Sequence, residues 1–288
     1  MTRDRAQLTI VIPAFNEEDR LPPTMEKVLE WADQTEVFEV ELIIVDDGSR
    51  DRTCDIVQEV VSKDSRVRLI RETHVGAVNA IMAGFRAAKY PLVGNMDADL
   101  AVHPREYETL LPHVHEKGIA QGSRLLRGDG EIEAVSKSWV RKLVSNCFGL
   151  VFKVLFKNQV EDPQIGFRLY WRDSVLKIMD VMRLGHDGIK HGELVVRGYG
   201  LGMTVTEIPV TYIHGEDSRC FPKQKLKAAY VTLEACVALF AMWIQCSVDY
   251  QTGILQRSPA RGAFFMWPFA LFIRKKHQKK HVAHDSSE

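Results

Sequence analysis

The sequence is poor in features that hold small secreted domains together. Its five cysteines, in 288 residues, are scattered, odd in number and without a C-x-x-C pair. We therefore expect neither a disulfide framework nor a zinc site, and we expect a reducing, cytosol-facing location. No long apolar run opens the chain, and Pro13 interrupts the first β-rich run soon after its start, so we expect no secretory leader.

An excess of charge of either sign is also missing. Lys and Arg together number 38, as do Asp and Glu, so the formal net charge is zero. Because no overall field would attract a polyanion, we expect no nucleic-acid partner. The G-x-G-x-x-G pattern that seats a dinucleotide pyrophosphate follows none of the predicted strands, which argues against an NAD enzyme.

The chain does contain a repeated alternation of strand and helix. Apolar, β-rich runs at 8–12, 40–45 and 67–70 are each followed by a polar turn and a helical pattern, and a fourth run leads to Asp97. With 45% hydrophobic residues, the chain can bury a core. Strands joined by helical crossovers form a mostly parallel sheet that binds ligands outside its carboxyl edge. We predict an α/β fold with flanking helices, in which the loops after these strands face one site.

Asp97 and Asp99 follow the fourth predicted strand, one residue apart. Paired carboxylates supply the oxygen ligands that Mg²⁺ or Mn²⁺ prefers, and a cation held there could bind a diphosphate. An isolated D-x-D is more often a polar turn. Here, however, it follows two other polar loops, at 13–18 and 46–49, that are predicted at the same edge of the sheet.

These loops read V-I-P-A-F-N-E-E, V-D-D-G-S-R-D and M-D-A-D-L, and together they resemble the nucleotide-sugar half of the family-2 glycosyltransferases. The resemblance implies a GT-A fold, a UDP-sugar or GDP-sugar donor, and a Mg²⁺ or Mn²⁺ ion held by Asp97 and Asp99. It implies that the donor is contacted by Pro13, Ala14, Glu17, Asp46 or Asp47, Asp97 and Arg124. The sequence departs from many relatives at 76–79, where G-A-V-N replaces a glycine-rich run with a lysine.

A second set of motifs concerns the acceptor. The segments V-E-D-P-Q-I-G-F-R-L-Y (160–170), E-L-V-V-R-G-Y-G-L-G (193–202) and V-T-E-I-P-V (205–210) resemble polyprenyl-phosphate sugar transferases, including dolichyl-phosphate mannose synthases and glucosyltransferases. The resemblance covers about residues 8–225 and implies an inverting transfer of glucose or mannose to a polyprenyl phosphate. The catalytic candidates are Asp99, Arg124 and Gln164, and the candidates for binding the acceptor phosphate are Arg168, Arg219 and Lys223.

Apolar stretches after residue 138 suggest a membrane surface. The stretch 139–156 fits an interface helix and a core helix equally well. The stretch 226–248 has the length of a membrane span, but Glu234 in its middle favours an interface or core helix. Aromatic residues at 263–273 precede the basic residues of 274–280, a pattern typical of binding to an anionic leaflet.

We therefore predict a transferase domain over residues 1–225 and a membrane-associated region over residues 226–288, at the cytoplasmic face of a membrane. Two other functions remain open. A transferase for a soluble or polysaccharide acceptor would have no use for the aromatic tail. A non-catalytic membrane scaffold with a decayed transferase fold would be expected to lack one of the two aspartates, and both are present.

Overall fold

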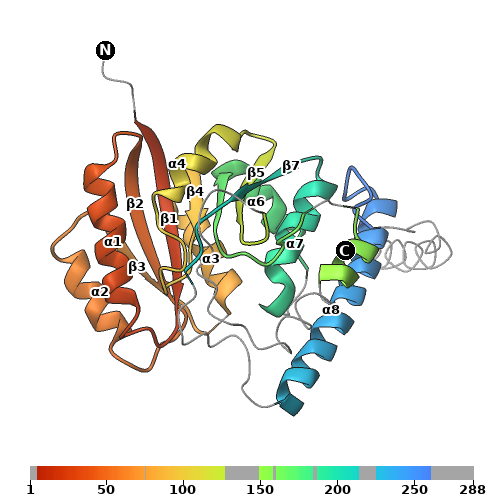
Figure 1. Cartoon of the computed structure of the whole chain (residues 1–288), viewed down its shortest axis with the longest axis horizontal. Coiled ribbons are helices and arrows are strands. Elements are labelled where there is room, and N and C mark those ends of the chain that lie inside the picture. Colours follow the sequence, from red (N-terminus) through yellow and green to blue (C-terminus); the bar gives the residue numbers. More distant parts are fainter. Residues whose placement is uncertain are drawn as a thin grey trace, which may run out of the picture.

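The computed structural model describes residues 5–74, 76–126, 149–157, 160–183, 187–213 and 225–260. In these residues the chain forms a seven-stranded sheet with the order β3-β2-β1-β4-β6-β5-β7 (Figure 1). The strands are β1 (Ala6–Ala14), β2 (Phe38–Asp46), β3 (Val67–Arg71), β4 (Leu92–Asn95), β5 (Gly118–Ser123), β6 (Arg168–Trp171) and β7 (Thr204–Pro209). The paired strands are parallel except at β6, which runs antiparallel to both β4 and β5. The predicted α/β, mostly parallel architecture is confirmed.

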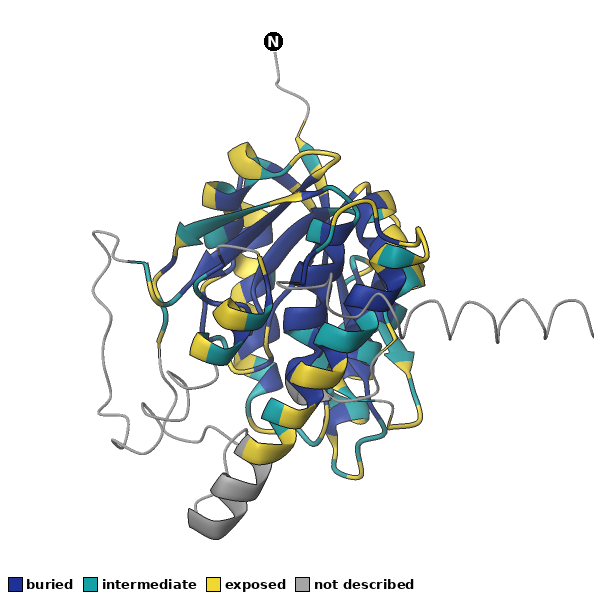
Figure 2. Cartoon of the chain, turned by 90° about the vertical axis from the view of Figure 1, so that its right-hand side faces the viewer, coloured by how far each residue is buried: buried dark blue, intermediate teal, exposed yellow. Residues whose placement is uncertain are grey.

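Helices cover both faces of this sheet. They are α1 (Leu21–Gln34), α2 (Thr53–Val61), α3 (Ala77–Ala87), α4 (Glu106–Leu110), a 3-10 turn (Leu111–His113), α6 (Arg172–Val181), α7 (Asp187–Gly200), α8 (Lys225–Gln251) and a short helix at 149–155. Apolar residues of α1, α2 and α4 pack on one face, and those of α3, α6 and α7 pack on the other. Strands with both faces covered require apolar residues at successive positions, which explains their continuous hydrophobic runs. Figure 2 shows the resulting buried centre.

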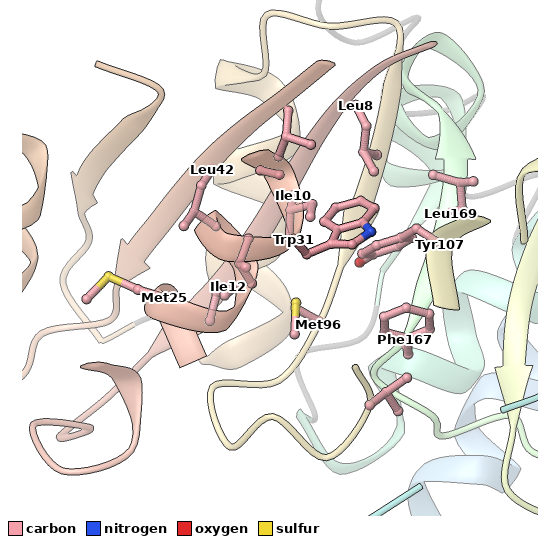
Figure 3. Close-up of a cluster of buried hydrophobic side chains, with 14 of the residues drawn as sticks. Leu8, Ile10, Ile12, Met25, Trp31, Leu42, Met96, Tyr107, Phe167 and Leu169 are labelled. Atoms are coloured by element: carbon pink, nitrogen blue, oxygen red, sulfur yellow. The ribbon is translucent and has the colours of Figure 1, made fainter. Parts of the chain in front are cut away.

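Aromatic side chains fill the core beneath α1 and α4. Tyr107 stacks on Phe167 with ring centroids 4.4 Å apart, and Trp31 lies beside Tyr107 with ring centroids 6.4 Å apart (Figure 3). Tyr107 comes so close to β4 that a Cβ at Gly94 would lie 2.6 Å from its ring. Helix α4 is short, because it gives way at Leu111 to the 3-10 turn that contains Pro112.

The strand register brings the predicted loops to one edge. Ala14 pairs with Asp46 at the ends of β1 and β2, and β4 ends at Asn95, which pairs with Val11 of β1. Because β6 is reversed, it begins where β4 ends, and Arg168 pairs with Asn95. The turn that precedes β6, residues 161–167, therefore reaches the same edge as the loop containing Asp97 and Asp99.

Helix α8 is attached to the sheet through α7. Its Leu239, Met242 and Cys246 form a third apolar cluster with Phe152 and Phe156. Within this contact lies a buried ion cluster, in which Arg197 of α7 pairs with Glu193 on its own helix and with Asp249 of α8. The side chains of all three are at most 2% exposed. The segments 139–148 and 263–280, for which a helix and a membrane contact are predicted, lie outside the described residues.

We expect Asp249→Ala to destabilise the fold strongly, because it leaves the buried Arg197 guanidinium without its partner on α8. The loss should be about 3–5 kcal/mol in the free energy of unfolding, measured by urea denaturation. Glu30→Ala is the matched control, since Glu30 and Lys27 form an ion pair whose side chains are about half exposed. That variant should lose no more than about 1 kcal/mol. Similar losses in the two variants would mean that the buried cluster does not hold α8.

Candidate active site

The loops after β1 and β2 are joined by backbone-to-side-chain hydrogen bonds. Asn16 donates its backbone N–H to Ser49 Oγ over 2.9 Å and accepts the Arg50 N–H at its Oδ1 over 2.8 Å. Next to it, the Glu17 N–H donates to Thr53 Oγ1 over 2.8 Å. Asn16 has a φ of +55°, a left-handed conformation that asparagine tolerates better than most residues. The two loops therefore form one connected wall at the carboxyl edge of the sheet.

Asp46 and Asp47, predicted to contact the nucleoside, are both buried and shape the backbone of this wall. The Asp46 carboxylate accepts the N–H groups of Gly48 and Ser49 over 3.2–3.3 Å. Burial and a hydrogen bond to Asp46 raise the pKa of Cys54 to about 11, so that thiol stays protonated. The Asp47 carboxylate accepts the Gly76 N–H over 3.0 Å. Their contact with a nucleoside stays a prediction.

The other residues predicted to bind the donor also lie along this edge. Ala14 is buried at the end of β1 and Pro13 is partly buried beside it. Glu17 forms a two-pronged ion pair with Arg20, in which Nε of Arg20 lies 2.6 Å from Oε2 of Glu17. Arg20 is close enough to Asp97 for its charge to lower the pKa of that residue. The charge of Arg20 in this wall therefore acts on the Asp97 carboxylate after β4.

Asp97 and Asp99 are both exposed, at the start of the loop that follows β4. The protein around Asp97 removes hydration from its carboxylate and Asp99 adds like charge, which together raise the pKa of Asp97 to about 6. Asp99 accepts the Ala101 N–H at Oδ1 over 3.2 Å. Gly166 lies directly against Asp97, since a Cβ there would be 2.4 Å from Asp97 Oδ1. The two carboxylates are thus close together, accessible and already partly desolvated.

Arg124 leaves the end of β5 and pairs with Asp162 of the turn before β6. Its Nε and Nη2 each donate to a different oxygen of the Asp162 carboxylate over 2.7 Å. Its guanidinium also lies 5.3 Å from the ring centre of Tyr212. Burial alone would raise the pKa of Asp162, but the hydrogen bonds and charge of Arg124 lower it. Arg124 is predicted to contact phosphate, and here it is held in a defined orientation by Asp162.

Arg168, predicted to bind the acceptor phosphate, is fully buried. Its Nε donates to Gln121 Oε1 over 2.9 Å and its Nη2 to the Pro163 carbonyl over 2.8 Å. Its Nη1 donates to Nδ1 of His191 over 3.1 Å. This arrangement makes Arg168 part of the framework of the site, and contact with an acceptor phosphate would require it to move. Gln164 lies on the same turn and is partly buried, whereas Arg219 and Lys223 lie outside the described residues.

The sequence patterns do not single out His191 or Gln121 as site residues. Burial lowers the pKa of His191 to about 3, and the like charges of Arg168 and Arg124 add to this effect. Because Arg168 can only donate, the neutral imidazole must accept at Nδ1 and carry its proton on Nε2. His191 is therefore a neutral, oriented group next to Arg168.

Asp97 and Asp99 fit a divalent cation that shares its ligands with a bound substrate. Among the residues that the structure describes, no three His, Cys, Asp or Glu side chains gather as a complete metal cage. A Mg²⁺ ion, however, is commonly held by one or two carboxylates together with water and substrate phosphates. The pair of exposed carboxylates matches that donor set, and the negative charge of Asp99 already raises the pKa of Asp97.

Comparison with known proteins agrees with this geometry. The sequence model of the family described as "Glycosyl transferase family 2" matches residues 9–179. The chain is 28% identical over 249 residues to a dolichyl-phosphate beta-glucosyltransferase of Trichomonas vaginalis, with 82% of this chain and 74% of that protein aligned. It is 28% identical over 211 residues to an undecaprenyl-phosphate mannosyltransferase of Micrococcus luteus, with 72% of this chain and 83% of that protein aligned.

Among solved structures, the chain resembles the glucosyl-3-phosphoglycerate synthase of Mycobacterium tuberculosis, crystallised with Mn²⁺, UDP-glucose and phosphoglyceric acid. The TM-score is 0.58 at 15% sequence identity, and the match covers 83% of this chain and 80% of that chain. At this identity the likeness concerns the fold alone.

We expect His191 to remain neutral in the folded protein. Its imidazole, followed by NMR and assigned with a His191→Gln variant, should keep a single proton on Nε2 from pH 8 to pH 5. The same residue in urea should titrate near the ordinary histidine value of about 6.5. As pH falls below that value, the unfolded chain takes up a proton that the folded chain refuses, so His191 lowers stability progressively toward pH 3. A native titration near neutral pH would contradict the burial of this ring.

Proposed function

Because the chain belongs to glycosyltransferase family 2, we propose that it transfers glucose or mannose from a nucleoside diphosphate sugar to a polyprenyl phosphate. The observation that carries this proposal is the pair of exposed carboxylates, Asp97 and Asp99, at the sheet edge where the loops of 14–18 and 46–53 form a wall. The names of the relatives support the acceptor, since they are dolichyl- and undecaprenyl-phosphate transferases.

The donor, a UDP-sugar or a GDP-sugar, would place its nucleoside against this wall and its diphosphate at Asp97 and Asp99. These two carboxylates would hold a Mg²⁺ or Mn²⁺ ion, which when bound neutralises charge on the departing diphosphate. Solved neighbours crystallised with UDP and either Mn²⁺ or Mg²⁺ support this choice. Arg124, held by Asp162, would present guanidinium N–H groups that do not bind Asp162 to a phosphate oxygen as negative charge grows there.

The nucleophile in this reaction would be an oxygen of the lipid phosphate, which is already ionised at neutral pH. No proton has to leave it, so the site does not require a general base. An attack in line with the departing diphosphate forms the new bond from the opposite face of the anomeric carbon. The reaction would then invert the configuration of the sugar.

A lipid acceptor requires the site to lie near a membrane surface. The described part of the chain has exposed apolar side chains that could contact such a surface. Exposed hydrophobic residues recur on one side of α8, at Leu233, Val237 and Phe240, and are 64%, 62% and 53% exposed. Leu150 and Val154, which are 64% and 60% exposed, lie on the helix at 149–155 that packs against α8. We call Leu233, Val237 and Phe240 the α8 patch. Figure 2 shows exposed residues along the projecting part of α8.

The described side chains of α8, from Leu233 on, are partly exposed and partly buried. Residues 233–251 are long and apolar enough to cross a membrane by length and composition. Yet Leu239, Met242 and Asp249 in this stretch are buried against the rest of the protein. We propose that α8 lies at the membrane surface with the α8 patch in the interface, at the cytoplasmic face. The aromatic and basic segment at 263–280 stays a predicted second anchor.

Replacing Asp99 by Asn should abolish transfer without unfolding the protein. The variant loses a ligand charge, but its Oδ1 can still accept the Ala101 N–H. We expect the rate of sugar transfer to lipid phosphate to fall at least about 100-fold. EDTA should have the same effect on the unaltered protein, and added Mn²⁺ should restore turnover. Asp173→Asn is the control, because Asp173 is 86% exposed on α6; if both variants are equally active, the cation site is elsewhere.

Replacing Phe240 by Glu should weaken binding to anionic vesicles. Removing this aromatic side chain from the interface should cost about 1.5 kcal/mol, or roughly tenfold in vesicle affinity measured by co-sedimentation. Donor binding should not change, because Phe240 lies outside the site. Gln58→Glu adds the same charge on α2, at the other end of the sheet, and should bind vesicles normally (Figure 1).

If both variants bind vesicles as the unaltered protein does, the α8 patch is not the membrane contact. If the unaltered protein does not bind vesicles at all, a soluble acceptor becomes the better interpretation.

A further inference from the structure

Glu207 occupies an unusual position on β7, close to the turn that carries Asp162. Its Oε2 accepts the Glu161 N–H over 2.6 Å, and its Oε1 accepts the Asp162 N–H over 2.9 Å. The same Oε1 accepts Nε2 of Gln121, its register partner on β5, over 3.0 Å. One carboxylate therefore binds two successive backbone N–H groups, which fixes the orientation of the peptide unit between them.

Other side chains of the sheet bind the carbonyl groups of the same turn. Gln121 Nε2 also donates to the Asp162 carbonyl over 3.1 Å, and Arg168 donates to the Pro163 carbonyl over 2.8 Å. Asn95, at the end of β4, donates to the Gly166 carbonyl over 2.6 Å. Side chains thus bind both carbonyl and N–H groups of the backbone of 161–166, and Glu207 supplies the acceptors for the N–H groups at its start.

This turn touches both charged parts of the candidate site. Asp162 holds the Arg124 guanidinium by two hydrogen bonds, and the Asp162 carboxylate also accepts the Arg124 N–H over 3.2 Å. Gly166, at the end of the turn, lies against the Asp97 carboxylate. A change in the turn would therefore move Arg124 relative to Asp97.

The chemistry of position 207 requires a carboxylate. The groups facing it are all donors: two backbone N–H groups and the amide of Gln121. The orientation of Gln121 is itself determined, because its Oε1 faces the Arg168 guanidinium, which can only donate. A glutamine at 207 would have one acceptor oxygen and would place its NH₂ against another donor.

We propose that Glu207 is a positioning residue for the transfer reaction: it fixes the turn at 161–166 so that Asp162 holds Arg124 toward the reacting phosphates. This inference rests on the proposed function, because it takes Arg124 to contact phosphate. It assigns Glu207 no contact with substrate. Its effect passes through the Asp162 backbone to the Asp162 carboxylate and from there to Arg124.

The test compares Glu207→Gln with Glu161→Gln. Glu161 lies on the same turn, but its carboxylate forms an exposed pair with Lys153, and only its backbone N–H reaches Glu207. Glu207→Gln should lower kcat roughly 10- to 100-fold through misplacement of Arg124, while KM for the donor changes less than about threefold. Glu161→Gln should keep the kcat of the unaltered protein.

Combining Glu207→Gln with Arg124→Lys separates positioning from a general loss of stability. A lysine cannot form the two-pronged contact with Asp162, so Arg124→Lys should itself lower kcat. If Glu207 acts through Arg124, the double variant should be no slower than the worse single variant, within about threefold. Multiplied effects would overturn the proposal, as would a harmless Glu207→Gln or a harmless Arg124→Lys.

A second readout does not depend on the acceptor. The Arg124 Nε–H, bound to Asp162 in the structure, should exchange slowly with solvent by NMR in the unaltered protein and in Glu161→Gln, and rapidly in Glu207→Gln. Slow exchange in Glu207→Gln would overturn the proposal even if the acceptor were not a lipid phosphate. Absence of transfer to polyprenyl phosphate by the unaltered protein, with the expected exchange pattern, would count against the proposed function alone.

Discussion

Strand β6 runs against its neighbours between β4 and β5, and the candidate site depends on this reversal. Because β6 begins where β4 ends, the chain arrives at the carboxyl edge through the turn at 161–167. That turn brings Asp162 to Arg124 and Gly166 to Asp97. In a parallel β6, Arg168 would stand at the far edge, and the turn before it would be separated from Asp97 by the length of the strand.

The reversal also sets the charge balance of the site. Asp97 is pushed toward its neutral form by the surrounding protein and by Asp99, while Arg124, Arg168 and Arg20 act in the opposite direction. Arg168 is fully buried, so its charge is screened less than that of a surface residue. In the proposed reaction, a cation would relieve the repulsion between the two aspartates, and Arg124 would face an anionic substrate.

Helix α7 connects this site to the proposed membrane contact. Near its start, His191 accepts a hydrogen bond from Arg168, and near its end, Arg197 pairs with Asp249 of α8. The two contacts are separated by less than two turns of one helix, so little rotation is possible between them. The orientation of the α8 patch relative to the carboxyl edge is therefore set by the part-buried Arg168–His191 contact and the buried Arg197–Asp249 pair.

Local patterns in the sequence were sufficient to predict the alternation of strands and helices and the edge of the sheet at which the polar loops meet. They were also sufficient to identify the family. Continuous apolar runs identify strands that are buried on both faces. Since ligands bind at the carboxyl ends of parallel strands, the loops containing Asp46, Asp97 and Asp99 are then expected at one edge of the sheet.

The partners of the charged residues depended on tertiary structure. Asp162 meets Arg124, and Glu207 meets Asp162, across 38 and 45 residues of chain. These contacts follow from the reversed β6 and from the register of β5 with β7, which no local pattern encodes. The burial of Arg168 also depended on tertiary structure. The sequence predicts a cation that is available to a phosphate, but the 161–166 turn and α7 pack around its guanidinium and remove it from solvent.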